Sequence, residues 1–374
     1  MKILFINMKI KESFKNIKIL LFKKIPFIKF LFLCIFSIII IIMNKNGKKI
    51  GVVGLPHDNN PGNNLLKFSI FIKLKELGFD PIIIGYSLIK NFYFLKKHVK
   101  LKVIKKSFFG LNESDYDILM VNSDQTWNNF TKYDDILLNI GYLKFAENWT
   151  IPRFVYGASL GVNYWKFSNK FDIIARRLLK KFSGISVREI GAIEIVEKHL
   201  GIHPELVLDP TLLIDKKHYL DLIKDFKINL NFKEKYLCIH QLDKNFLIEK
   251  LIKDVSKLFK YRIYKINLNK EKYVENFICC INNSTAVITD SFHGTIFSII
   301  FEKPFITYLN KNRGSGRFFS LIKIFNLSQR IVEQKNFKKI NINLLKTPLN
   351  LNQSLLNYLK KKSINFLKKN LNKK

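Results

Sequence analysis

Short apolar runs alternate with helix-like segments along most of this chain, and this alternation constrains the fold more than any other feature. Residues 50–53, 118–121 and 154–158 are uncharged, mostly apolar runs with the length of a buried strand. Between such runs lie segments whose apolar residues recur every three or four positions, as Leu66 and Ile70 do, which is the helical period. Strands that alternate with helices predict mostly parallel sheets with helices on both faces, an α/β fold.

The alternation occurs in two halves. A polar stretch rich in Lys and Asn, residues 216–234, separates them and has the composition of a linker. The length of 374 residues also favours two domains, because a single core stops growing near ~250–300 residues. We therefore predict a basic and hydrophobic N-terminal segment over 1–47, an α/β domain over 48–225, a second α/β domain over 226–345, and a basic amphipathic C-terminal helix over 346–374.

The N-terminal segment contains 14 consecutive residues without a charge, 30–43. A helix of that length reaches roughly 21 Å, less than the ~30 Å of a hydrocarbon core. Extended back to residue 25, the run is long enough to span a bilayer if Lys29 reaches toward the interface. We expect residues 25–43 to associate with a membrane, either across it or at its surface. Two alternatives stay open: a helix packed on the domain, or a chain that truly starts at Met43.

The formal net charge of +35 raises nucleic acid as a partner. The lysines are scattered along the chain rather than clustered, which is typical of a solvated basic surface, so we do not predict nucleic-acid binding. Such a surface still attracts polyanionic substrates and anionic lipid. The four cysteines form neither a disulfide framework nor a metal knuckle, and no other metal constellation is present in the sequence. With the apolar run, this predicts a protein at the cytoplasmic face of the membrane.

Polar clusters directly follow the predicted strands, and ligands of parallel sheets bind at that edge. The strongest cluster is residues 289–294, where Thr289 or Ser291 can cap the next helix. The helix start favours an anion and disfavours a charged imidazolium on His293. The cluster therefore predicts an anion site, with a plain helix cap as the alternative.

Two further clusters carry chemistry of the same kind. Arg188 lies where a strand passes into a helix, so its guanidinium can hold a carboxylate or phosphate by two hydrogen bonds, or pair with Glu189 at the surface. Residues 122–128, Asn-Ser-Asp-Gln-Thr-Trp-Asn, place polar groups beside an indole. That combination suits a sugar, although Asp124 could equally cap a helix and Trp127 could lie in the core.

Three loops are weaker candidates. Residues 57–64 and 156–161 could hold an anion or a sugar, but either could be an ordinary turn, and in the first loop Asn63 or Asn64 can cap the helix. A basic loop with Arg313 and Arg317 around two glycines could close on a substrate or be a surface turn. Residues 115–117 have the Asp-x-Asp form of metal-dependent glycosyltransferases, but they precede a strand, so we interpret them as a turn.

With these motifs in this order, the chain resembles the polysaccharide pyruvyl transferase family over roughly residues 49–325. The resemblance rests on Gly62-Asn63, on residues 122–128, on Tyr156-Gly157-Ala158-Ser159, on residues 186–189 with Asp209-Pro210-Thr211, and on residues 289–294 with Lys303-Pro304.

The resemblance implies two Rossmann-like domains, as in the glycosyltransferase B architecture, with the active site in the cleft between them. It also implies phosphoenolpyruvate as the donor, no further cofactor, and a saccharide of a cell-surface polysaccharide such as a capsule as the acceptor, often lipid-linked. The product is a cyclic pyruvate ketal, and phosphate is released.

In the family, an arginine that matches Arg188 and a histidine that matches His293 line the donor site. Some members carry a second arginine two residues before that histidine, where this chain has Ser291. Arg313, Arg317 or a lysine could replace it. We expect catalytic roles for His293, Asp124 and Asp290, and substrate contacts from Arg188, Ser291, Gly294, Asn63, Asn122, Gln125, Trp127, Ser159, Arg313 and Arg317.

Two other functions are compatible with the sequence. A glycosyltransferase of the B architecture would bind the diphosphate of a nucleotide sugar at the helix start near His293. A basic membrane-surface protein without enzymatic activity would show salt-dependent binding and no turnover. The placement of the polar clusters at strand ends favours an enzyme.

Overall fold

The computed structural model describes residues 47–56, 60–86, 93–104, 108–129, 131–226, 234–268, 272–309 and 314–373. The chain divides into two compact units, Met1–Lys48 and Lys49–Lys374, and the fold below is that of the second unit. The membrane-association prediction for residues 25–43 lies outside the described residues. Within the described residues, no helix combines the length and the apolar character needed to cross a bilayer.

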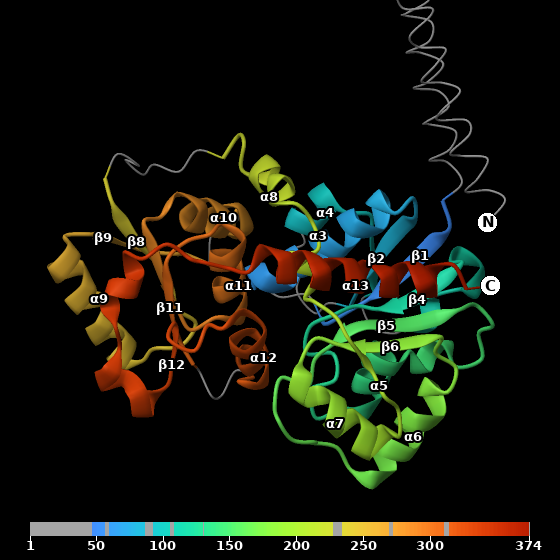
Figure 1. The fold of residues 1–374 in the computed structure, drawn as a ribbon. Helices are drawn as coiled ribbons and strands as arrows, with labels where there is room; N and C mark the ends of the chain where they lie inside the picture. Colours follow the sequence, from blue (N-terminus) through green and yellow to red (C-terminus); the bar gives the residue numbers. More distant parts are fainter. Residues whose placement is uncertain are drawn as a thin grey trace, which may run out of the picture. The chain divides into compact units, whose positions relative to one another are not determined.

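The first sheet has seven parallel strands in the order β3-β2-β1-β4-β5-β6-β7 (Figure 1). Its strands are β1 (Lys49–Val53), β2 (Asp80–Tyr86), β3 (Leu101–Ile104), β4 (Ile118–Val121), β5 (Arg153–Ala158), β6 (Gly184–Val187) and β7 (Glu205–Leu206). The strand order reverses between β1 and β4, and ligands of such sheets bind at the carboxyl ends near that reversal.

The second sheet has five parallel strands in the order β12-β11-β10-β8-β9. Its strands are β8 (Tyr236–His240), β9 (Arg262–Lys265), β10 (Ala286–Thr289), β11 (Phe305–Tyr308) and β12 (Ile331–Val332). Two parallel sheets with helices confirm the predicted α/β class.

Helices connect the strands in both halves. Those that begin before the second sheet are α3 (Pro61–Glu76), α4 (Tyr93–His98), α5 (Asp134–Tyr142), α6 (Asn169–Leu179), α7 (Ile190–Leu200) and α8 (Lys216–Leu222). The later helices are α9 (Phe246–Phe259), α10 (Tyr273–Asn283), α11 (Phe292–Ile300), α12 (Gly316–Phe325) and α13 (Gln353–Leu371).

Local signals account for several helix ends. Ser291 caps α11, and its hydroxyl accepts a hydrogen bond from the Gly294 N–H. Gly201 ends α7 with a φ of 67°, a left-handed conformation that glycine adopts without strain. The cap of α3 differs from the expectation: Asn60 accepts from the Gly62 N–H, while Asn63 and Asn64 lie inside the helix. Pro61 explains the earlier start, because its fixed φ suits the first helical position.

Several elements escaped the sequence analysis, among them strands β3 and β12 and helix α8. Strand β3 is only partly buried and contains Lys102. Its sequence is therefore not a continuous apolar run, and the strand pattern did not reveal it. Strand β12 has only two residues. The segment predicted as a linker, 216–234, includes the short helix α8, whose Tyr219 is fully buried.

Aromatic packing joins the two halves. The ring of Tyr219 on α8 lies 6.3 Å from Phe68 on α3 and 4.9 Å from Phe297 on α11, centroid to centroid. These residues belong to one continuous cluster of buried apolar side chains that includes both β1 and β8. The two halves of the second unit are therefore held together by a shared core.

Helix α13 returns to the first sheet (Figure 1). Its Phe366 packs against Phe154 and Tyr156 of β5, and its Ser363 hydroxyl accepts a hydrogen bond from the Leu208 N–H at 2.9 Å. The apolar side of this basic helix is thus used within the protein, since Leu367 and Leu371 are fully buried.

Candidate active site at the carboxyl edges of the two sheets

Arg188 joins three strand ends of the first sheet. Its Nη2 donates to Oδ1 of Asp124, which follows β4, at 2.9 Å, and its Nη1 donates to Asp209, which follows β7. The Arg188 side chain is only 1% exposed. A buried guanidinium that is shared by two carboxylates is held in one orientation, so this arginine is not the surface pair that the sequence left open.

The charges of this group stabilise one another. Burial alone would raise the pKa of Asp124, but the nearby Arg188, His293 and Arg317 outweigh it and hold that pKa at about 2. Burial alone would lower the pKa of Arg188, but Asp209 and Asp124 raise it. Asp124 is therefore a carboxylate at neutral pH. Its φ of 89° is strained for a residue with a side chain, and no helix begins there, so it is not a helix cap.

Arg317 brings a second guanidinium from the other half of the chain. It lies in the first turn of α12, and its Nη1 stands 3.8 Å from Oδ1 of Asp124. Phe292 packs against both cations, with the guanidinium carbons of Arg188 and Arg317 at 5.0 and 4.8 Å from its ring centroid. Burial and the charge of Arg188 lower the pKa of Arg317 to about 10, so both arginines remain charged.

His293 lies in the first turn of α11 and faces the first half of the chain. Its Nε2 is 3.9 Å from Oδ2 of Asp209, and its ring lies against Gly62 of α3. Burial is the main cause that lowers the pKa of His293; Asp209 and Asp124 oppose it, and the result is about 4. The imidazole is therefore neutral at pH 7.

Two helix N-termini meet at this contact, because Gly62 and His293 each occupy the first turn of a helix. The positive ends of both helix dipoles and the two guanidinium groups thus lie in one region. These groups favour an anion here, while Asp124 and Asp209 already balance part of their positive charge.

A family model described as polysaccharide pyruvyl transferase matches residues 60–312. The chain belongs to the polysaccharide pyruvyl transferase family. It is accordingly a transferase, and its family acts in polysaccharide synthesis. No curated protein shows a significant match.

Several solved structures share the fold of this pyruvyl transferase. The UDP-GlcNAc 2-epimerase of Neisseria meningitidis bound to UDP-GlcNAc has a TM-score of 0.54 at 10% identity, with 86% of this chain and 100% of that chain covered. S. aureus MnaA with UDP has a TM-score of 0.50 at 12% identity, with 84% and 91% covered. A putative UDP-N-acetylglucosamine 2-epimerase from Listeria monocytogenes has the same score and coverage at 9% identity. At this identity the likeness concerns the fold alone.

Glu189 holds the loop after β5 at the candidate site. Its buried carboxylate accepts hydrogen bonds from the Ser159 hydroxyl and from the N–H groups of Leu160 at 3.1 Å and Gly161 at 3.2 Å. Ser159, an expected substrate contact, is therefore engaged in holding the loop after β5. Burial raises the pKa of Glu189 despite the nearby Arg188.

Other candidates have mainly structural partners. Asp290 accepts from the N–H groups of Leu242 at 2.7 Å and Asp243 at 3.0 Å, so it anchors the loop after β8; no contact with His293 supports the expected catalytic role. Asn63 donates to the Pro56 carbonyl at 2.9 Å. Gly294 provides close packing, because a β-carbon there would stand 2.9 Å from Nδ1 of His240.

Trp127 corrects an expectation. Its indole is 1% exposed, stacks on Tyr142 at 5.3 Å, and donates to the Gly141 carbonyl at 2.8 Å. It is a core residue, so it offers no face to a sugar. Gln125 accepts from Asn128 at 2.6 Å.

Several buried polar atoms near these loops lack a hydrogen-bond partner among the described residues, including Nε2 of His293 and Nε of Arg188. Both amide atoms of Asn122 are unpaired in the part of the chain that the structure describes, and so are both ring nitrogens of His240. Burial, with His293 nearby, lowers the pKa of His240 to about 3, so it is neutral. Asn122 thus keeps a donor and an acceptor for a ligand or water.

The expected catalytic and substrate-contact residues did not include Asp209, Glu189, Phe292 or Gly62. Asp209, Glu189 and Gly62 lie in the motifs that carry the family resemblance, but no role was expected of them. Phe292 looks like any apolar helix residue in the sequence. Arg313 lies outside the described residues, as do residues 57–59. Among the described residues, no group of three His, Cys, Asp or Glu side chains could hold a metal ion.

Proposed function

We propose that this protein transfers pyruvate from phosphoenolpyruvate to two hydroxyls of a saccharide of a cell-surface polysaccharide, forming a cyclic ketal. The observation that carries the proposal is the meeting of Arg188 and Arg317 with the N-termini of α3 and α11 beside His293. Phosphoenolpyruvate combines a carboxylate and a phosphate in one small molecule, and two guanidinium groups match that pair of anions.

Arg317 supplies the cation that Ser291 does not. Ser291 caps α11, whereas Arg317 reaches the same phenyl ring as Arg188 from α12. In the conformation described, Asp124 and Asp209 neutralise Arg188. Donor binding therefore has to exchange one of these carboxylate contacts, and the more weakly held Arg317–Asp124 pair, at 3.8 Å, is the one that we expect to yield.

The reaction forms two C–O bonds at the central carbon of the donor. One acceptor hydroxyl attacks that carbon and gives its proton to a base, while the methylene carbon receives a proton and becomes a methyl group. The second hydroxyl then attacks the same carbon, loses its proton, and phosphate leaves with the C–O bonding pair. The site must supply an acid for carbon, a base for oxygen and cations for the donor.

His293 is the group that we assign to proton transfer. Its imidazole is neutral in the free enzyme, because its pKa is lowered to about 4, so one ring nitrogen has an unprotonated lone pair. A bound multivalent anion would raise that pKa, so the histidine would take up a proton together with the donor. Asp209 lies 3.9 Å from Nε2, close enough to stabilise a protonated imidazole by its charge. Asp124 is ionised, and we assign it to orienting an acceptor hydroxyl or the arginines.

The deciding experiment measures phosphate release from phosphoenolpyruvate with saccharide acceptors. Folded His293→Ala should lower kcat by roughly 10²–10⁴ with little change in donor KM. Release of nucleotide from a nucleotide sugar, with no phosphate from phosphoenolpyruvate, would replace this proposal with glycosyl transfer. Binding to anionic surfaces without any turnover would support the non-enzymatic alternative.

We also propose that the reaction takes place at the cytoplasmic face of a membrane, on a lipid-linked acceptor. The uncharged run at 30–43 and the free, buried cysteines Cys238, Cys279 and Cys280 support this location. Fractionation of the full chain, compared with a chain that starts at Met43, tests it. Equal recovery of both without detergent would contradict an anchor in residues 25–43.

A further inference from the structure

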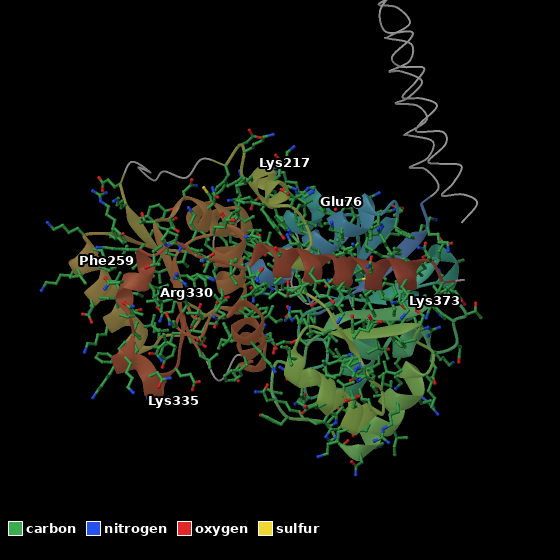
Figure 2. The ribbon with its side chains drawn as sticks, in the orientation of Figure 1. Glu76, Lys217, Phe259, Arg330, Lys335 and Lys373 are labelled. Atoms are coloured by element: carbon green, nitrogen blue, oxygen red, sulfur yellow. The ribbon has the colours of Figure 1, made fainter. Side chains whose placement is uncertain are left out.

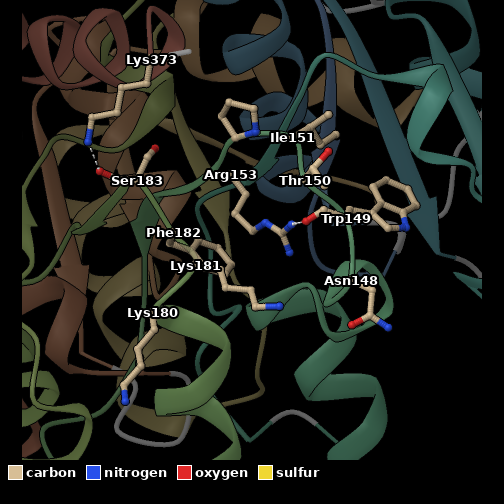
Figure 3. Close-up of a pocket in the computed structure, with 11 residues that line it drawn as sticks. Asn148, Trp149, Thr150, Ile151, Arg153, Lys180, Lys181, Phe182, Ser183 and Lys373 are labelled. Carbon is tan, nitrogen blue, oxygen red and sulfur yellow. Dashed lines mark hydrogen bonds between the residues drawn. The ribbon is translucent and has the colours of Figure 1, made fainter.

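A cavity of about 510 Å³ lies at the edge of the first sheet opposite to the candidate active site (Figure 3). Residues 148–153 lead into β5 and residues 180–183 lead into β6, so the cavity sits at the amino ends of these strands. Arg188 and Asp124 lie at the carboxyl ends of the same sheet. The cavity is therefore separate from the site described above.

The wall of this cavity is cationic. Its charged lining residues are Arg153, Lys180, Lys181 and Lys373, and it contains no Asp or Glu. Four cations among 11 lining residues is about twice the share of Lys and Arg in the whole chain, 64 of 374. The cavity thus attracts anions more strongly than an average part of this basic surface.

Arg153 forms the fixed part of the wall. It is 3% exposed and donates to the carbonyls of Ala146, at 2.5 Å, and Trp149 (Figure 3). Its Nε has no hydrogen-bond partner within the described residues. Arg153 therefore contributes its positive charge to the wall, while its guanidinium is held in place by backbone carbonyls.

The neighbouring carboxylates are already engaged. Glu113 accepts from the Thr150 hydroxyl at 2.8 Å and the Ile151 N–H at 3.0 Å. Glu147 pairs with Arg177 at 3.1 Å. Because Glu113 and Glu147 have other partners and the lining contains no carboxylate, the lysines of the cavity have no carboxylate partner in its wall.

Three lysines belong to the lining of the cavity. Lys180, Lys181 and Lys373 are exposed, and the amine of Lys373 donates to the Ser183 carbonyl at 2.5 Å. Lys180 and Lys181 follow the last turn of α6, where cations also offset the helix dipole. Stabilisation of the helix end could explain Lys180 and Lys181, but it explains neither the buried Arg153 nor the cavity itself.

The lining also has an apolar part, with Trp149, Ile151, Pro152 and Phe182 beside the cations. Tryptophan and lysine together are typical of surfaces at the membrane–water interface. Chain connectivity points the same way. Strand β1 starts at Lys49 on this edge, two strands from β5, and only residues 44–48 separate it from the uncharged run.

From this charge and connectivity, we propose that the cavity binds the phosphate headgroup of an anionic membrane lipid. Lys180, Lys181 and Lys373 are its ligands, and the buried Arg153 adds a positive charge behind them. This proposal does not depend on which donor the active site uses. It adds a headgroup contact to any anchoring by residues 25–43.

The test is sedimentation of the full chain with vesicles of phosphatidylcholine, with and without phosphatidylglycerol. The pocket variant carries Lys180→Gln, Lys181→Gln and Lys373→Gln. The control variant carries Lys335→Gln, Lys338→Gln and Lys339→Gln, which are exposed lysines around a 3-10 helix that follows β12. Both variants lose the same charge, and Figure 2 shows Lys335 and Lys373 in different halves of the second unit.

Each lysine that approaches an anionic surface contributes about fivefold in affinity. Phosphatidylglycerol should increase the vesicle affinity of the wild-type chain. In the pocket variant this increase should be at least tenfold smaller, and in the control variant at most about threefold smaller. Equal losses would show that the basic surface acts as a whole, and no loss in the pocket variant would show that these lysines only cap helices. Either result overturns the proposal.

Inorganic pyrophosphate at constant ionic strength separates the two sources of phosphate. If it binds the wild-type chain without vesicles, but not the pocket variant, the cavity takes a soluble phosphate compound and the lipid proposal fails. Circular dichroism checks the fold of both variants. If the pocket variant is misfolded, Lys180→Gln with Lys373→Gln replaces it and spares Lys181, whose amine donates to the Glu147 carbonyl at 2.6 Å.

Discussion

The imidazole of His293 lies so close to Gly62 that a β-carbon on this glycine would stand 2.1 Å from its Nδ1. No side chain tolerates that distance, so any larger residue at position 62 must displace the histidine or the start of α3. Gly62 thus sets the position of a group that belongs to the other half of the chain.

The first prediction follows from this contact. Gly62→Ala should lower kcat by roughly 10²-fold, because a shift of about 1 Å in a positioned catalytic group has that effect. Gly54→Ala is the matched control, since a β-carbon there would meet its neighbours at 3.6 Å or more. Steady-state phosphate release measures both. Near-normal turnover in a folded Gly62→Ala protein would mean that the exact position of His293 does not matter for catalysis.

Arg317 gives the second prediction. Arg317→Ala should raise the donor KM at least tenfold, and Arg317→Lys should recover only part of this loss, because one ammonium cannot form paired hydrogen bonds. Arg262→Ala, at an exposed arginine on β9, serves as the control. An unchanged donor KM in Arg317→Ala would mean that Arg317 does not replace the second donor-site arginine, whose position Ser291 occupies in this chain.

Arg188 should matter for stability as well as for binding. Its removal leaves Asp124 and Asp209 buried without their shared cation, and breaking such a pair typically costs about 3–5 kcal/mol. Arg188→Ala should therefore lower the free energy of unfolding by an amount of that order, measured by urea titration. A variant as stable as wild type would show that the two carboxylates find other partners.

The histidines predict how stability depends on pH. His293 and His240 have pKa values of about 4 and about 3 in the folded protein, below the ordinary 6.5. Between these values and pH 6.5 the unfolded chain binds more protons, so the free energy of unfolding falls as the pH is lowered through this window. Each histidine contributes a slope on the order of 1.4 kcal/mol per pH unit.

His240→Leu tests this assignment, because leucine suits the apolar wall beside Phe277 and does not titrate. The variant should show a shallower fall in stability between pH 6.5 and 4, by urea titration at several pH values. The same slope in variant and wild type would assign the pH dependence to other groups.

Trp127 provides a prediction that separates packing from substrate binding. Trp127→Phe removes the hydrogen bond to the Gly141 carbonyl and leaves space beside Tyr142, so it should lower the unfolding free energy by about 1–3 kcal/mol. The acceptor KM should not change. A rise in acceptor KM without loss of stability would restore the sugar-stacking interpretation.

Much of the fold was predictable because its signals are local. Buried parallel strands need apolar runs such as 118–121, and helix ends need residues such as Ser291 and Gly201, so the sequence alone indicated two α/β halves. It also singled out Arg188 and His293, since polar residues directly after buried strands reach the functional edge of a parallel sheet.

Tertiary structure alone decided which of these residues meet. The Arg188–Asp209 and Arg317–Phe292 contacts join positions that are distant in the sequence, and no local pattern specifies such partners. The same holds for Trp127, whose polar neighbours suggested a ligand while packing placed it in the core. Local propensity is set by a few neighbouring residues, whereas burial and charge pairing depend on how the two sheets pack. That packing made Arg317 a neighbour of Arg188 and Gly62 a neighbour of His293.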